Sequence, residues 1–287
     1  MSILGAVGAL LAAGGVAFAT WLAARPIFDA PVLRRTNFRG KEVPVAAGVV
    51  LVTAVIAVEA VLAVAEVLRH DPVVGHASRE LTLPLVLGFG LLGAFDDLAA
   101  HGDDRGFRGH LKAMVHGRLS TGGLKLLGGG LLAVVVVGRT GVDTVLDLIL
   151  GASLVALAAN LGNLFDRAPG RTTKVALFGA LALLVVTPGV ERGALAGMLL
   201  VVGAGAGLLL PDLREELMLG DAGSNVLGAA LGLGVVLTTG RIAEALTVVV
   251  LVGLNLASEK ISFSKVIASV GVLNAIDMLG RRPPTTP

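Results

Sequence analysis

Long apolar stretches recur along almost the whole chain, and short polar segments separate them. Each stretch is close to the roughly 20 residues that an α-helix needs to cross the hydrocarbon core of a bilayer. The pattern predicts an all-α, polytopic integral membrane protein in which residues 1–287 form one domain with about nine transmembrane helices. The expected spans are residues 3–24, 43–67, 81–99, 123–138, 144–164, 174–189, 194–211, 222–239 and 242–258.

The first and last apolar stretches need separate interpretations. Residues 2–24 carry no charge and no positively charged leading segment, so they predict a transmembrane helix rather than a signal peptide. Near the C-terminus, a weakly apolar stretch at 266–279 is interrupted by Asn274 and Asp277. It predicts a surface helix within a cytoplasmic or interfacial tail at 258–287, with a tenth span as the alternative.

Composition and charge support a membrane location and give an orientation. The chain is 55% hydrophobic and 15% charged, whereas about a quarter of the residues in a soluble domain are charged. Cysteine is absent, which excludes disulfides and thiolate metal sites. With the N-terminus outside, 18 of the 23 Lys and Arg residues fall in inner segments, so the inner side is predicted to be the cytoplasm. The net charge of +2 gives no indication of nucleic-acid binding.

Four polar clusters lie at the ends of apolar stretches, at residues 37–44, 95–98, 160–166 and 219–225. The predicted orientation places all four on the cytoplasmic side. Polar groups at the edge of hydrocarbon are costly and usually functional. The four clusters therefore predict one carboxylate-rich site that is built from several helices.

The acids and amides of these clusters suggest cation and phosphate chemistry. Asp96 and Asp97 are adjacent and repel each other unless a cation or a base neutralises them, and hard cations such as Mg²⁺ take oxygen ligands. The alternative interpretation of Asp96 and Asp97 is that they form the solvated end of a helix. Asn160, Asn163 and Asp166 recur every three residues, which places them on one stripe of a helix. The alternative interpretation of these three residues is that they form hydrogen bonds between packed helices.

Asp221 precedes an apolar helix and has two interpretations. It either caps the helix N-terminus or lies beside a phosphate bound there and holds a metal ion. The inner loop 101–122, which includes Lys112, and the adjacent Lys125 carry cations that suit an anionic substrate. The alternative for these cations is the ordinary positive-inside bias. The three histidines of this loop are expected to be solvated.

The order of motifs resembles a known family. Asn-x-Arg-Gly-x-x-x-Pro follows the first span, Asp-Asp closes the third, Asn-x-x-Asn-x-x-Asp closes the fifth and Gly-Asp-x-Gly-Ser opens the eighth. Over about residues 30–240 the chain is similar to the polyprenyl-phosphate N-acetylhexosamine-1-phosphate transferases. These include phospho-N-acetylmuramoyl-pentapeptide transferase and the undecaprenyl-phosphate GlcNAc-1-phosphate transferases.

The resemblance implies an enzyme of cell-wall (peptidoglycan) biogenesis in the bacterial cytoplasmic membrane. It would transfer a sugar-1-phosphate from a UDP-amino sugar to a polyprenyl phosphate, undecaprenyl phosphate being the expected lipid, and release UMP. Mg²⁺, or Mn²⁺, is the implied cofactor, and a homodimer is plausible. The implied catalytic residues are Asp96, Asp97 and Asp166, the metal ligands are Asp221 and Asp97, and the substrate-binding residues are Asn37, Arg39, Lys112, Lys125, Asn160, Asn163, Arg171, Lys174, Gly223 and Ser224.

Two departures from the family pattern keep other functions open. Asp166 is followed by Arg167 where the family has glycine, and the segment 257–265 lacks the family's histidines. One alternative is a catalytically inactive homologue that binds lipid or nucleotide, or scaffolds envelope enzymes. Another is a secondary transporter. The absence of an internal repeat and the position of the acids at one membrane face disfavour a transporter.

Overall fold

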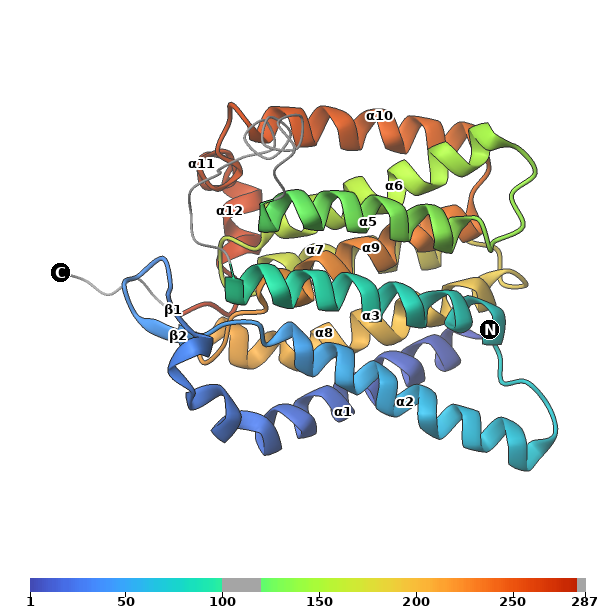
Figure 1. The fold of residues 1–287 in the computed structure, drawn as a ribbon, viewed down its shortest axis with the longest axis horizontal. Coiled ribbons are helices and arrows are strands. Elements are labelled where there is room, and N and C mark those ends of the chain that lie inside the picture. The colour runs from blue at the N-terminus through green and yellow to red at the C-terminus, as the bar shows by residue number, and fades with distance from the viewer. Residues whose placement is uncertain (100–119, 283–287) are drawn as a thin grey trace.

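The computed structural model describes residues 1–99 and 120–282, and in this part of the chain it is helical apart from turns and one small hairpin (Figure 1). Long helices form a bundle and run in alternating directions. The hairpin, α11 and α12 lie at one end of the bundle, which we call the hairpin end, and the N-terminus lies at the other.

A helix occupies each of the nine apolar stretches that the sequence singles out. Seven helical segments are long and apolar enough to cross a membrane, namely those that contain α1, α2, α3, α6, α8, α9 and α10. These helices confirm the predicted all-α fold and several of the predicted apolar spans. The helices α5 and α7 are shorter than these seven segments. The nine helices are α1 (Ile3–Ala24), α2 (Gly48–Arg69), α3 (His76–Ala99), α5 (Thr121–Val137), α6 (Val145–Phe165), α7 (Arg171–Val186), α8 (Ala196–Leu213), α9 (Gly220–Thr238) and α10 (Arg241–Ser258).

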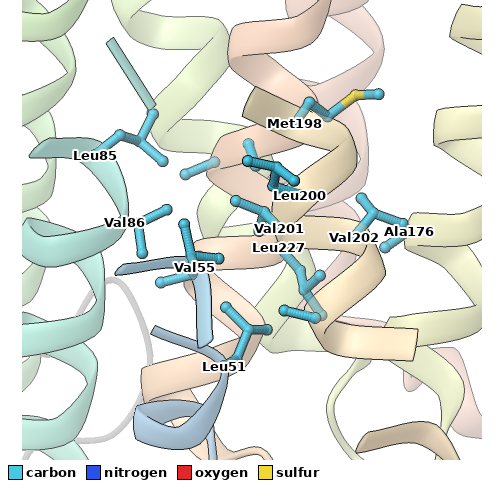
Figure 2. Packing of buried hydrophobic residues seen from close by; sticks show 14 of the residues in the cluster. Leu51, Val55, Leu85, Val86, Ala176, Met198, Leu200, Val201, Val202 and Leu227 are labelled. Carbon is cyan, nitrogen blue, oxygen red and sulfur yellow. The ribbon is translucent and has the colours of Figure 1, made fainter. Parts of the chain in front are cut away.

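Helix α9 is the centre of the bundle. It packs against α2, α3, α6, α7 and α8, and most of its first four turns are buried. Figure 2 shows part of this buried cluster, which includes Leu227 of α9, Leu51 and Val55 of α2, and Leu85 and Val86 of α3. Helix α10 is the opposite case, because only two of its residues are buried. A helix that exposes so much apolar surface suits contact with lipid.

Glycines allow the neighbouring helices to approach the first turns of α9 closely. A Cβ atom on Gly48 of α2 would overlap the backbone of Gly223, and one on Gly93 of α3 would overlap the backbone of Asp221. On α6, a Cβ at Gly162 would overlap the carbonyl of Ser224. Small residues at such contacts let helix backbones pack together in lipid.

The hairpin was not anticipated by the all-α prediction. Strand β1 (Arg34–Thr36) pairs antiparallel with β2 (Glu42–Pro44), so α2 begins at Gly48 rather than at residue 43. Two short 3₁₀ helices, Arg25–Asp29 and Pro31–Leu33, lead into β1. At the last residue of β2, the carbonyl of Pro44 accepts the N–H of Met218 at 2.7 Å. The hairpin is therefore attached to the loop that leads into α9.

The C-terminal tail folds back onto the hairpin end instead of forming a tenth span within the described residues. The predicted surface helix at 266–279 is two short helices, α11 (Phe263–Ser269) and α12 (Gly271–Met278). The chain is extended at Val270, with φ −103° and ψ 109°, and this residue separates them. Most of α12 is exposed, as a surface helix would be, but its Asp277 is buried.

The opposite end holds a buried ion-pair group. Arg79 lies in the first turn of α3, because this helix begins at His76, before the predicted span at 81–99. Its guanidinium contacts Glu66 of α2 and lies 3.5 Å from Glu59. A short 3₁₀ helix (Arg192–Leu195) precedes α8 at this end.

We predict that Gly228→Ala destabilises the protein. A Cβ at Gly228 would overlap the carbonyl of Ala158 on α6, and overpacking of a close contact costs about 1–3 kcal/mol. Gly253 of α10 has open space around it, so Gly253→Ala is the matched control and is expected to be neutral or slightly stabilising, because alanine is the better helix former. The midpoint of thermal unfolding of the purified protein in detergent measures both. Equal shifts in the two variants would contradict the packing described for α9.

Candidate functional site

Four helices bring polar side chains together near the hairpin end. Lys125 of α5 donates from Nζ to Oδ2 of Asp96 on α3 at 3.0 Å, and it also contacts Oδ2 of Asp221 on α9. Asn163 of α6 donates to the same oxygen of Asp221 at 2.8 Å. We call these four residues the Lys125 cluster. The sequence predicted each of them as a site residue, and the structure places them in one hydrogen-bonded group.

The adjacent acid Asp97 has a different environment. Its Oδ1 accepts the N–H of Asp221 at 2.9 Å, and its Oδ2 accepts the N–H of Ala222 at 3.1 Å. These two N–H groups belong to the first turn of α9, where no intrahelical acceptor exists. Asp97 therefore caps α9 from another helix, whereas the sequence had suggested Asp221 itself as the cap.

Gly220 makes this cap possible. Its φ of 67° is in the left-handed region that favours glycine, and a Cβ there would meet the carboxylate of Asp97. The negative carboxylate also complements the positive end of the helix dipole. Asp97 was predicted as a catalytic residue and metal ligand. In the structure each of its two oxygens accepts one backbone N–H of α9, which gives Asp97 a positioning role.

The charges of the site are not balanced within the described residues. Asp96, Asp97 and Asp221 contribute three carboxylates, and Lys125 is the cation that contacts two of them. The side chains of Lys125, Asp96 and Asp221 are only 15–19% exposed. Among the described residues, no group of three or more His, Cys, Asp or Glu side chains could hold a metal ion. A divalent cation would therefore have two carboxylates here and would take its other ligands from water or substrate.

An acid-lined cavity of about 290 Å³ adjoins the cluster beneath the hairpin. Asp221 lines it together with Asp166, Asp212 and Glu215, so cavity and cluster are continuous. Burial, followed by the charge of Asp212, raises the pKa of Asp166 well above its ordinary value. Sequence reasoning missed Asp212 and Glu215. The available signal was an acid at the end of the apolar α8, the same position that identified Asp96 on α3.

The predicted residues of the first motif organise the hairpin around Glu215. Asn37 donates to its Oε2 at 3.0 Å, and Arg39 approaches its Oε1 at 2.9 Å. Lys41 donates to its carbonyl at 3.1 Å. Glu215 has φ 55°, an unusual value for a residue that is not glycine, and these contacts hold it there. Asn37 also lines the cavity and is the better placed of the two predicted residues to meet a ligand.

Three further predicted substrate-binding residues lie within helix packing. Asn160 donates to Asn255 of α10 at 2.6 Å, which is the interhelical seam left open as its alternative. Gly223 and Ser224 are buried in α9, and Gly223 provides the close contact with Gly48. These positions do not support contact with a substrate.

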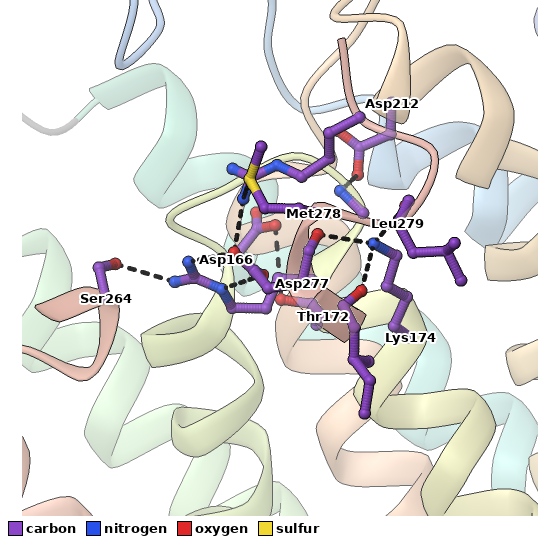
Figure 3. Close-up of polar contacts among 12 residues, drawn as sticks. Asp166, Thr172, Lys174, Asp212, Ser264, Asp277, Met278 and Leu279 are labelled. Atoms are coloured by element: carbon purple, nitrogen blue, oxygen red, sulfur yellow. Dashed lines mark hydrogen bonds and ion pairs between the residues drawn. The ribbon is translucent and has the colours of Figure 1, made fainter. Parts of the chain in front are cut away.

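The cations Arg171 and Lys174 hold the C-terminal tail. Arg171 donates from Nε and Nη2 to the two carboxylate oxygens of Asp277 at 2.8 and 3.1 Å, and from Nη1 to Ser264 at 2.9 Å. Lys174 donates to the carbonyls of Ile276, Asp277 and Leu279 at 2.7–3.0 Å (Figure 3). Both were predicted to bind substrate, but their donors are occupied by the tail. The predicted residue Lys112 lies outside the described residues.

Comparisons with protein-family models and with curated proteins found no match for this chain.

We predict that Asp97→Asn destabilises the protein. An amide offers one acceptor oxygen, so one N–H of the first turn of α9 loses its partner, which costs about 1–3 kcal/mol. Asp71 is exposed at the opposite end of the bundle, and Asp71→Asn is the matched control. Thermal unfolding measures both variants. If Asp97→Asn unfolds at the wild-type temperature, Asp97 does not cap α9.

We also predict that docking of α12 weakens in acid. Burial opposes ionisation of Asp277, but the hydrogen bonds and charge of Arg171 outweigh it and lower the pKa of Asp277. A carboxylate with a lowered pKa stabilises the folded state fully above its ordinary pKa of about 4, and this contribution is lost as pH falls through the folded pKa. Hydrogen exchange of residues 271–282, corrected for the intrinsic pH effect, should be constant from pH 8 to 5 and rise below pH 4. In Asp277→Asn, exchange should already be fast at pH 7.

Proposed function

We propose that the chain is a membrane-embedded, Mg²⁺-dependent phosphosugar transferase. It moves an N-acetylhexosamine-1-phosphate from a UDP-sugar to a polyprenyl phosphate. An oxygen of the lipid phosphate attacks the sugar-side phosphorus, the bond from this phosphorus to UMP breaks, and a lipid-linked pyrophosphoryl sugar forms. The observation that carries the proposal is the Lys125 cluster, in which Asp96, Lys125, Asn163 and Asp221 meet from four helices.

The chemistry of this reaction suits such a cluster. Phosphoryl transfer depends mainly on positioning and on neutralising phosphate charge. The Lys125 ammonium contacts both Asp96 and Asp221, which supports a cation position between their carboxylates. We infer that Asp96 and Asp221 hold Mg²⁺, which would supply charge neutralisation of the two substrates. Asp97 would act indirectly, by fixing the first turn of α9 and with it Asp221.

The cavity offers groups for the nucleotide sugar. Its carboxylates, including Asp212 and Glu215, can accept hydrogen bonds from sugar hydroxyls. Asp166 also lines the cavity, and its pKa is raised by burial, which favours the protonated form that can donate a hydrogen bond to a phosphate oxygen. Asn37 at the wall of the cavity can do the same with its amide.

The position of the site fits a lipid acceptor and a soluble donor. The site lies near the end of apolar helices, where the phosphate of a membrane lipid would be and where a nucleotide can arrive from water. The asymmetry of Lys and Arg supports a cytoplasmic hairpin end and an outer N-terminus. We therefore propose that the site lies at the cytoplasmic face of a bacterial membrane. We also propose that α5 and α7 cross the membrane together with the seven longer helices, which makes nine spans.

One observation favours a second candidate. Arg171 and Lys174 are engaged by the tail and are not available for phosphate in this structure. This state would suit a homologue that has kept the fold and lost the reaction. It would bind lipid or nucleotide without releasing UMP.

Release of UMP from a panel of UDP-amino sugars tests the transferase. Purified protein, undecaprenyl phosphate and Mg²⁺ should give UMP from at least one donor. Asp221→Asn should reduce the rate at least about 10²-fold, the scale of losing one electrostatic group from an active site. Arg69→Ala, at the exposed opposite end of α2, should keep the wild-type rate. If Asp221→Asn releases UMP at the wild-type rate, Asp221 does not hold the metal ion. If folded wild-type protein releases no UMP from any donor, the inactive homologue is favoured.

A further inference from the structure

We propose that the ammonium of Lys125 occupies the cation position of the site in the metal-free protein. When a divalent cation enters, it displaces this ammonium from between the carboxylates, and the freed ammonium becomes a phosphate-binding group. Lys125 would thus couple metal binding to binding of an anionic substrate. The inference rests on the proposed function, but its test does not depend on turnover.

The geometry places one cation where another would bind. Lys125 Nζ is 3.0 Å from Oδ2 of Asp96 and also contacts Oδ2 of Asp221. The two acids belong to α3 and α9, so Lys125 is the group that holds together carboxylates from different helices. A hard cation such as Mg²⁺ or Mn²⁺ would take the same oxygens at about 2.0–2.2 Å.

The two cations cannot share this position. Each is attracted by the same carboxylate oxygens, and like charges at such short range repel strongly at a site that is largely shielded from water. Asn163 donates to the same oxygen of Asp221 but is neutral, so it can remain when the metal enters. Metal entry therefore requires that Lys125 move.

The side chain of Lys125 can move without disturbing its helix. It starts in the second turn of α5, and the helix start is fixed separately, because Oγ of Ser120 accepts the N–H of Gly123 at 3.1 Å. A lysine side chain has a flexible four-carbon stem and a compact charge with three donors. The Lys125 side chain is 15% exposed, so it is not fully enclosed by its neighbours. We infer that the ammonium moves toward the side from which substrate phosphates would approach the metal.

The alternative is that Lys125 is a permanent ion pair that keeps the carboxylates in place. The two cases differ in the sign of one effect. If Lys125 competes with the metal, removing its charge strengthens metal binding. If it organises the carboxylates for the metal, removing its charge weakens metal binding or leaves it unchanged.

Binding of Mn²⁺ alone, followed by electron paramagnetic resonance in detergent without substrate, measures this sign. We expect Lys125→Gln to bind Mn²⁺ about tenfold more tightly or better, because a competing charge is removed. Lys125→Arg keeps the charge and should not tighten binding. Asp96→Asn should weaken it. Lys260→Gln, at an exposed lysine after α10, is the matched control and should match the wild type.

A second measurement uses the wild-type protein, so it does not depend on folding of the variants. Mn²⁺ should increase labelling of Lys125 by an amine-reactive reagent, mapped by mass spectrometry, while labelling of Lys260 stays constant. Weaker or equal Mn²⁺ binding in folded Lys125→Gln, or no change in labelling at saturating Mn²⁺, overturns the inference.

The two proposals fail in different ways. If Lys125→Gln binds Mn²⁺ more tightly but the wild type releases no UMP, the proposed transferase activity is wrong and the proposed exchange of Lys125 for a metal ion stands. If the wild type releases UMP but Lys125→Gln binds Mn²⁺ with unchanged affinity, the proposed transferase activity stands and the proposed exchange of Lys125 for a metal ion is wrong.

Discussion

The close approach of α2, α3 and α6 to the first turns of α9 is the constraint on which the rest of the structure depends. Glycines at 48, 93 and 162 bring three backbones against α9. This contact carries Asp97 to the N-terminus of α9 and Asn163 to Asp221. In lipid, where apolar side chains gain little by leaving the solvent, such packing and the polar contacts beside it specify which helices adjoin. The same contacts therefore hold the bundle together and build the site.

Much of the architecture follows from patterns within single segments. The apolar stretches predicted the long helices. An acid or amide at the end of a stretch predicted Asp96, Asn163 and Asp221 as site residues, and the structure brings these three together. The approach of these helix ends could be inferred because successive spans alternate in direction, so polar ends on one side must face the same region. The small hairpin was missed because two three-residue strands leave almost no periodic signal.

The residues that sequence reasoning assigned differently share one property: their partners are far away in the chain. Arg171 pairs with Asp277, and Lys174 binds carbonyls of the same short helix, each about 100 residues later. Asn160 finds Asn255 on α10 in the same way. A cation beside a predicted phosphate site looks the same in sequence whether it binds a ligand or a tail. Only the tertiary contacts distinguish the two, and here they assign both cations to the tail.

The cap of α9 by Asp97 also has a consequence for how the protein is made. Asp97 and its partner Asp221 are separated by 124 positions. At about 5–20 residues per second of synthesis, Asp97 waits on the order of ten seconds in the membrane before α9 exists. During this time its carboxylate needs water, which the edge of a bilayer supplies and its centre does not. Its location at a helix end therefore suits a nascent chain as well as a finished one. The site forms only when α9 has joined the bundle, so no chain that ends before α9 contains it.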